Sequence, residues 1–176
     1  GESLRHAIRV ARMVAANYLQ NIGKSQLDPA RVVALLKHAQ ENAKDPAPIK
    51  IWLDYDKARV FKAAGHIDKA RKAYASVLKR KGSESWAWFG LSSTYLGDPK
   101  KAICLTAYGL NCTHDPIFSI PGLVQMAELL AETGAHEHAS KVLIRLFEIY
   151  KQNGWPIKDK VLNLTSCSWF DGSLHT

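Results

Sequence analysis

The chain has 176 residues, of which 47% are hydrophobic and 23% charged, a composition typical of a folded domain. This composition excludes extended disorder, and no apolar run approaches the roughly 20 residues that a membrane-spanning helix needs. The net charge of +8 is uneven, because residues 1–84 hold 17 Lys and Arg against 8 Asp and Glu, whereas residues 85–176 are close to neutral. A basic first half attracts nucleic acid, acidic protein segments or anionic lipid, and charge alone does not choose among them.

Residues 1–45 predict an N-terminal helical hairpin. Apolar side chains recur at three- and four-residue spacing over residues 3–20, which indicates a first amphipathic helix. Asp28 followed by Pro29 is typical of a helix start, with the carboxylate as N-cap, and apolar residues continue to Ala39. The run Asp45-Pro46-Ala47-Pro48 predicts a break, since a proline in a helix interior removes a hydrogen bond.

The rest of the chain repeats itself. Five small or apolar positions recur 69 residues apart, two steps of about 34, a period typical of helical repeats. These positions are Ala58, Phe61, Gly65, Ala70 and Tyr74, and then Ala127, Leu130, Gly134, Ala139 and Leu143. We expect three helical hairpins, at 51–84, 85–119 and 120–152, with helices at about 51–64, 67–80, 85–96, 99–112, 121–133 and 136–151. We expect residues 153–176 to cap the apolar end of the stack with a short helix at about 157–165.

These positions resemble the tetratricopeptide repeat (TPR) family over about residues 51–151. Trp88 and Tyr95 also fit the family pattern, whereas Asp54 stands where a large residue belongs, and Thr106 and Leu143 replace a late aromatic. The resemblance implies an all-α fold, a right-handed α–α superhelix or TPR-like solenoid of antiparallel helical hairpins. It also implies a scaffold that binds a protein or peptide.

A second, fainter resemblance concerns the segments around Trp52, Trp86 and Trp155. They are similar to helical-repeat regions of bacterial proteins linked to tellurite-resistance or conflict systems, which tend to carry a nucleic-acid-binding domain further along. We therefore expect this chain to be a segment of a longer bacterial protein.

The first helices of such hairpins line a concave groove, and aromatic residues recur there at the repeat step. Trp52 pairs with Trp86 and Tyr55 with Phe89, each 34 residues apart, beside Arg59 and Lys62. This pattern predicts a groove for a peptide with apolar anchors and an acidic or C-terminal carboxylate group. The alternative is that neighbouring helices cover these rings as ordinary packing.

A basic patch is the second candidate site. Its residues are Arg5, Arg9 and Arg12 on one face of the first helix, and Lys69, Lys72, Lys79, Arg80 and Lys81 further on. Several such cations in a row can hold nucleic-acid phosphates without reading sequence, which makes an accessory nucleic-acid-binding module the rival to peptide binding. The alternatives are a charged helix face that is simply solvated, and a structural spacer or oligomerisation arm.

Catalytic and metal-binding patterns are missing from the sequence. There is no phosphate loop, no nucleophile elbow and no pair of catalytic carboxylates, so we expect a non-catalytic module without cofactor. His136 and His138 lie two apart, on opposite sides of a helix, so they are not expected to share a metal ion. The odd number of cysteines predicts reduced, buried thiols in a cytoplasmic protein. Because no apolar run is long enough to span a bilayer, we expect no membrane partner. Cys104 and Cys112 are eight residues apart on one predicted helix, too far for a disulfide.

Overall fold

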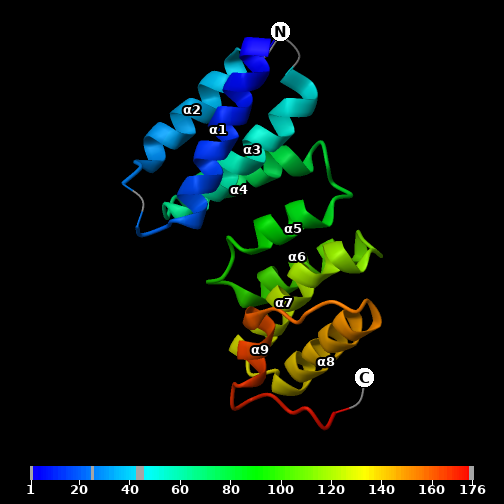
Figure 1. Ribbon diagram of the computed structural model, residues 1–176. Helices are drawn as coiled ribbons and strands as arrows, with labels where there is room; N and C mark the ends of the chain where they lie inside the picture. Colours follow the sequence, from blue (N-terminus) through cyan, green and yellow to red (C-terminus); the bar gives the residue numbers. More distant parts are fainter. Residues whose placement is uncertain (1, 25, 43–45, 175–176) are drawn as a thin grey trace. The chain divides into compact units, whose positions relative to one another are not determined.

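The computed structural model describes residues 2–24, 26–42 and 46–174, and these residues form helices without any strand (Figure 1). The all-α class expected from the sequence is confirmed. In chain order the helices of the described residues are α1 (Glu2–Gln20), α2 (Pro29–Glu41), α3 (Pro46–Ala63), α4 (Ile67–Leu78), α5 (Ser85–Ser92), α6 (Pro99–Asn111), α7 (Pro116–Glu132), α8 (His136–Gln152) and α9 (Asp159–Thr165).

The chain divides into two compact units, one up to Gly82 and one from Ser83 onward. In unit 1, α1 pairs with α2 and α3 pairs with α4, and α3 also packs against α1 and α2. Fully buried alanines, among them Ala11, Ala15 and Ala58, let these helices approach closely. Larger side chains such as Leu36 and Leu53 fill the space that remains.

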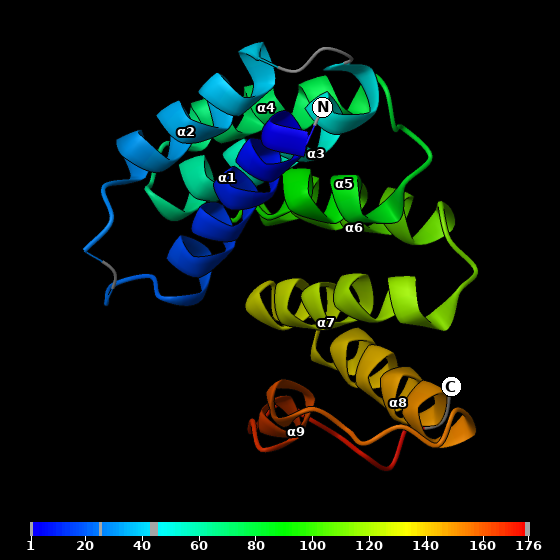
Figure 2. The ribbon, with the colours of Figure 1, turned by 45° about the horizontal axis from the view of Figure 1, so that its top comes forward.

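Unit 2 has the same plan, with α5 against α6 and α7 against α8. Contacts of α7 with both α5 and α6 join the two hairpins. Figure 2 shows α9 beside α8, where its Val161 is buried against Leu143, Leu146 and Tyr150. The last helix therefore covers the apolar side of the α7–α8 hairpin, with Trp155, Trp169 and Phe170 packed around it.

The turns explain two of the positions that recur 69 residues apart. Gly65 and Gly134 have φ angles of 79° and 78°, a left-handed conformation that residues with a side chain rarely adopt. Each lies between the two helices of a hairpin, in the turns α3–α4 and α7–α8. The recurring alanines, such as Ala70 and Ala139, are completely buried where the helices cross.

Among the described residues, an aspartate N-cap followed by proline begins α2, α6 and α7, with Asp28, Asp98 and Asp115 as the caps. Asp28 Oδ1 accepts a hydrogen bond from the Ala30 amide at 2.9 Å, as the sequence predicts for α2. Asp115 Oδ1 does the same for the Ile117 amide at 2.9 Å, so α7 begins at Pro116. The expected start near residue 121 is therefore wrong. Pro121, at the expected start, lies inside α7.

Two other expected boundaries also differ. α5 ends at Ser92 rather than near residue 96, because Ser93 and Thr94 donate their hydroxyls to the carbonyls of Gly90 and Leu91, each at 2.7 Å. Such local bonds compete with helix continuation. α3 begins at Pro46, so the prolines of the expected break stand in its first turn, where backbone amides need no helical acceptor. Asp45 lies outside the described residues.

Candidate functional site

Two carboxylates on α3 form the electrostatic centre of unit 1. Asp54 and Asp56 are only 6% and 5% exposed, and buried charges need partners to remain ionised. Being two residues apart on a helix, they point in different directions, and each has its own set of cations. In the sequence, Asp54 stands out only as a departure from the repeat pattern, and no pattern marks Asp56.

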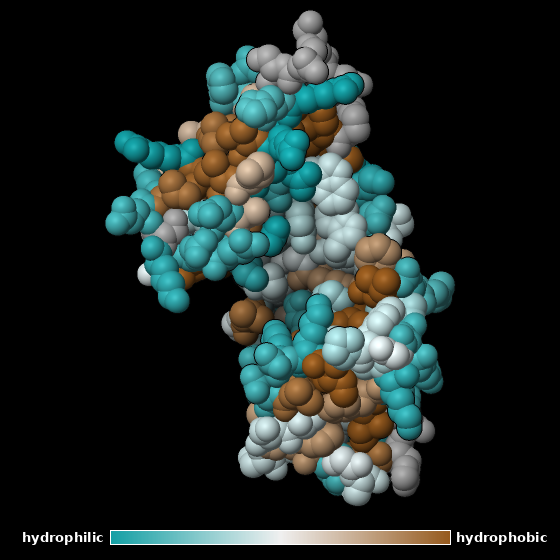
Figure 3. Space-filling model, in the orientation of Figure 1, coloured by the Kyte–Doolittle hydropathy of each residue, from teal (hydrophilic) through white to brown (hydrophobic). Residues whose placement is uncertain are grey.

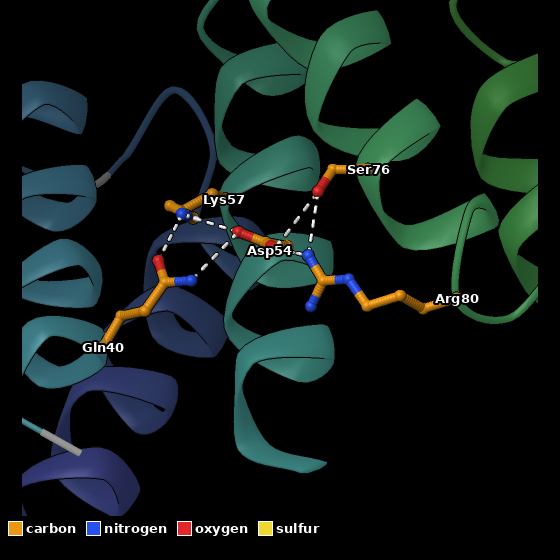
Figure 4. A network of polar contacts seen from close by, with 5 residues as sticks. All are labelled: Gln40, Asp54, Lys57, Ser76 and Arg80. Atoms are coloured by element: carbon orange, nitrogen blue, oxygen red, sulfur yellow. Dashed lines mark hydrogen bonds and ion pairs between the residues drawn. The ribbon is translucent and has the colours of Figure 1, made fainter. Parts of the chain in front are cut away.

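Asp54 holds three helices together (Figure 4). Lys57 Nζ lies 2.7 Å from Asp54 Oδ1, and Arg80 Nη2, in the turn after α4, lies 2.8 Å from Oδ2. Lys57 also donates to Gln40 Oε1 of α2 at 2.6 Å, and Arg80 donates to Ser76 Oγ at 2.9 Å. Burial alone would raise the pKa of Asp54, but the hydrogen bonds and charges of Lys57 and Arg80 lower it below its usual 3.8.

Asp56 joins α3 to α1. Arg12 Nε donates to Asp56 Oδ2 at 2.7 Å, and the Arg59 guanidinium lies 3.9 Å from Oδ1. The Arg12 guanidinium also lies over the Trp52 ring, 5.5 Å from its centre. The side chain of Arg12 and the residue Trp52 are each 42% exposed, so this cation–aromatic pair remains open to a partner.

A shallow hollow of about 400 Å³ extends along the outer side of α1. It is lined by Arg5, Ile8, Arg9, Arg12, Met13 and Ala16. We call these residues the α1 face. Met13 is 61% exposed, and Val10 beside it is also exposed. Of the three arginines on this face, Arg12 pairs with Asp56, and Arg5 and Arg9 have no ion pair within the described part of the chain. Figure 3 shows brown apolar and teal hydrophilic residues interleaved over the region of α1 and α2.

The residues predicted to line a concave groove do not all lie on one exposed surface. Tyr55 is half-buried, with its ring edge-on to Tyr74 at 5.9 Å and the Arg59 guanidinium 5.7 Å from its centre. Burial raises the pKa of the Tyr55 hydroxyl, with a smaller opposing effect from Arg59. Tyr55 therefore packs between α3 and α4. Lys62 is half-buried in the last turn of α3.

Trp86 and Phe89 belong to unit 2, whereas the other predicted groove residues belong to unit 1. Trp86 Nε1 donates to Glu84 Oε2 at 3.2 Å. Phe89 is 6% exposed, and its ring lies against Gly109 of α6 and Gly122 of α7 so closely that a Cβ at either glycine would overlap it. This burial corrects the expectation that Phe89 lines an open groove, because its ring joins three helices of unit 2.

The residues of the predicted basic patch differ in whether they form ion pairs with buried carboxylates. Lys69, Lys72 and Lys79 are exposed on α4 and at its C-terminal end. Arg80 is held by buried Asp54, and Lys81 is half-buried. With Arg12 tied to Asp56, two of the eight predicted cations are therefore partly neutralised by carboxylates that the sequence pattern did not connect to them.

Polar side chains also meet inside unit 2. Ser92 Oγ donates to the Ala102 carbonyl at 2.7 Å and lies 2.8 Å from Thr106 Oγ1. Gln125 Nε2 of α7 donates to the same Ser92 Oγ at 2.9 Å. Ser92 and Thr106 are completely buried. This cluster explains how Thr106 occupies a place where the repeat pattern has an aromatic residue.

The described residues also place the acidic, histidine and cysteine side chains that the sequence raises for metal and thiol chemistry. They contain no cluster of His, Cys, Asp and Glu suited to a metal ion, and Glu137 pairs with Lys141 at 2.7 Å. Cys104 is exposed, contrary to the expected buried position, because it lies on the outer side of α6, and Cys112 and Cys167 are half-buried. Across the parts of the chain that are described, no helix combines the length and apolarity needed to cross a membrane.

Comparisons with known proteins support this architecture. Residues 51–175 match the family model described as a domain of unknown function, DUF7017. The chain belongs to the DUF7017 family. The TPR-like repeats of a protein described as a kinesin light chain, from Podospora anserina, have a similar fold, with a TM-score of 0.65 at 16% identity. That match covers 90% of this chain and 82% of the other. A search of curated proteins found no match.

The DUF7017 match begins at Ile51, inside α3. It therefore includes Asp54, Asp56 and Arg80, whereas Arg12 and Gln40, which contact the two carboxylates or their partners, precede it. The α1–α2 hairpin is thus bound to the DUF7017 region through the same buried acids that organise α3 and α4. The α1 face belongs to this preceding hairpin.

Proposed function

We propose that this chain is a non-catalytic helical-repeat scaffold, and that the exposed cation–aromatic surface of unit 1 binds an acidic protein or peptide segment with apolar anchors. The fold similarity to TPR-like repeats supports a scaffold of this class. The surface consists of the α1 face together with Trp52 and Arg59 of α3.

The contact between Arg12 and Trp52 carries the proposal. Two sets of residues that the sequence assigned to separate sites, an arginine stripe and an aromatic groove, meet there. Asp56 fixes the Arg12 guanidinium, so little side-chain freedom is lost when a ligand binds. Arg5 and Arg9 continue the positive charge along α1, and Met13 supplies exposed apolar area between them.

The chemistry of this surface selects the ligand. An exposed guanidinium binds a carboxylate through paired hydrogen bonds, and an indole ring offers a flat apolar contact beside it. A segment that alternates acidic and apolar residues matches both features. The predicted extension of the groove to Trp86 stays a prediction, because Trp86 belongs to unit 2.

The test uses a library of fluorescent peptides that alternate Glu with Leu or Phe. We expect saturable binding that an Arg9→Glu/Arg59→Glu variant weakens by about 100-fold, since each reversed charge removes an attraction and adds a repulsion. The matched control is Lys72→Glu/Lys79→Glu, which changes charge equally on α4 and should leave the affinity within about twofold. Unchanged binding by the arginine variant would refute the assignment.

Nucleic acid is the second candidate, favoured by the exposed cations of α4 and by the exposed Trp52 ring, on which a base can stack. It predicts binding of single-stranded RNA or DNA that weakens steeply between about 50 and 200 mM salt. It also predicts that Lys72→Glu/Lys79→Glu and Arg9→Glu/Arg59→Glu weaken nucleic-acid binding to a similar extent. A flat salt response would eliminate this candidate.

A further inference from the structure

A second hollow in unit 1 shares no residue with the α1 face. It has a volume of about 300 Å³ and lies between the N-terminal half of α2 and the α3–α4 turn. Its lining is Pro29, Ala30, Val33, Ala34, Lys37, Phe61, Ala64, His66 and Lys69. A volume of this size is at the lower end of the range for small-molecule sites.

The walls of the hollow are apolar for a simple reason. Ala30, Val33, Ala34 and Lys37 follow helical spacing, so they lie on one face of α2. Phe61 closes the opposite side from the last part of α3, and the His66 ring stands edge-on to it at 6.4 Å. An apolar body entering the hollow would meet mainly aliphatic carbon and the Phe61 ring.

The polar groups at the rim are cationic. Lys37 projects from α2, and Lys69 from α4 lies 5.8 Å from the centre of the Phe61 ring. Within the described residues neither lysine has an ion pair, and no carboxylate lines the hollow. Asp68, next to Lys69 in the sequence, pairs with Arg71 at 3.4 Å, and Glu41, four residues from Lys37 on α2, does not line the hollow.

We infer that this hollow binds a small free carboxylic acid with a compact apolar body. The body occupies the space over Phe61 and Val33, and the carboxylate lies between Lys37 and Lys69. Because the two lysines come from different helices, one carboxylate can meet both, and burial of the apolar body weakens competition from water. The inference is independent of the proposed peptide surface.

The experiment follows backbone amide shifts by NMR while 3-phenylpropionate is titrated into the whole chain. We expect saturable shifts at Ala30, Lys37, His66 and Lys69. The neutral amide 3-phenylpropionamide should bind about tenfold more weakly, since a hydrogen bond to a charged group contributes more than one to a neutral group. Acetate, which has no apolar body, should give no saturable shifts. A hexapeptide ending in phenylalanine tests the other source of such a carboxylate.

Variants test separately how the hollow binds the carboxylate and how it binds the apolar body. Lys37→Gln/Lys69→Gln should weaken the acid at least about tenfold and leave the amide unchanged. Ala34→Phe, at an exposed position of α2, should fill the hollow and abolish both. Lys72→Gln is the matched control and should bind as the parent chain does, while melting curves report that each variant is folded.

Three results would overturn the inference. One is the absence of saturable shifts at the lining residues. Another is evidence that the lysines do not recognise the carboxylate. This would be equal affinity of the parent chain for the acid and the amide, or an unchanged affinity of Lys37→Gln/Lys69→Gln for the acid. The third is binding of the peptide but not of the free acid, which would assign the hollow to a chain terminus instead.

Discussion

Arg80, in the turn that follows α4, contacts the buried carboxylate of Asp54 on α3, with 2.8 Å between Nη2 and Oδ2. The same carboxylate is 2.7 Å from Lys57, which in turn donates to Gln40 of α2. A repeat position that ordinarily holds a large apolar residue is thus filled by a charged group whose partners come from its own helix and from α4. The packing of α2, α3 and α4 depends on this network as well as on apolar contact.

Replacing Asp54 by alanine should destabilise the chain by about 3 kcal/mol, because it leaves Lys57 and Arg80 beside a buried site without their counter-charge. Urea unfolding measures this change. Asp68→Ala is the control, since Asp68 has a side chain that is 89% exposed and pairs only weakly with Arg71, and it should cost less than about 0.5 kcal/mol. If the network is the cause, Asp54→Leu combined with Lys57→Met and Arg80→Met should regain most of the loss.

The lowered pKa of Asp54 makes the free energy of unfolding depend on pH. The folded state favours the ionised carboxylate, so its contribution is present above the ordinary pKa of 3.8 and is lost as the pH falls through the lower, folded pKa. We expect the free energy of unfolding to fall between roughly pH 5 and 2, and to fall less in Asp54→Asn. Glu137→Gln, which removes an exposed carboxylate paired with Lys141, is the comparison and should change this slope little. Equal slopes in the parent chain and Asp54→Asn would contradict the role of the network.

Gly122 has no room for a side chain, because a Cβ there would overlap the ring of Phe89. Gly122→Ala should therefore destabilise the chain by about 1 to 3 kcal/mol through overpacking, despite the higher helix propensity of alanine. Gly97 has open space around it, and Gly97→Ala should be nearly neutral. Thermal melting compares the two, and Phe89→Leu in the Gly122→Ala background should restore part of the loss. A neutral Gly122→Ala would mean that the ring moves aside freely.

The capping helix α9 offers two adjacent residues with opposite environments. Val161 is 1% exposed in the core of unit 2, whereas Leu162 is 44% exposed. Val161→Ala should cost about 2 kcal/mol because it leaves a cavity against α8. Leu162→Ala should cost less than about 0.5 kcal/mol. Similar losses in the two variants, measured by denaturant unfolding, would show that α9 does not cap the unit as described.

Most of the helices could be predicted from local patterns. The spacing of apolar residues, the aspartate caps at Asp28 and Asp98 and the glycine turns at Gly65 and Gly134 act over a few residues, so their effect can be read in order along the chain. The errors arose where local signals competed. Ser93 and Thr94 shortened α5 through their own backbone bonds, and Pro121 lay inside a helix that Asp115 had already begun.

The candidate sites show the limit of such patterns. Helical periodicity places Arg12 and Trp52 on exposed faces, but their meeting depends on how α1 packs against α3, which no local spacing encodes. Periodicity also treats Phe89 as equivalent to Tyr55, although the Phe89 ring is buried in close contact with Gly109 and Gly122 of two other helices.

Sequence alone therefore established the helical class, the repeat period and the positions of small residues where helices cross, because backbone propensity and amphipathic spacing are local properties. Tertiary packing decided which charges are free. Asp54 and Asp56 are far in sequence from Arg80 and Arg12, and only the close approach of α1, α3 and α4 brings these opposite charges together in a region from which water is largely excluded. The carboxylates are buried while Arg12 stays partly exposed, so this packing also decides which arginines and lysines form the surfaces available to a partner.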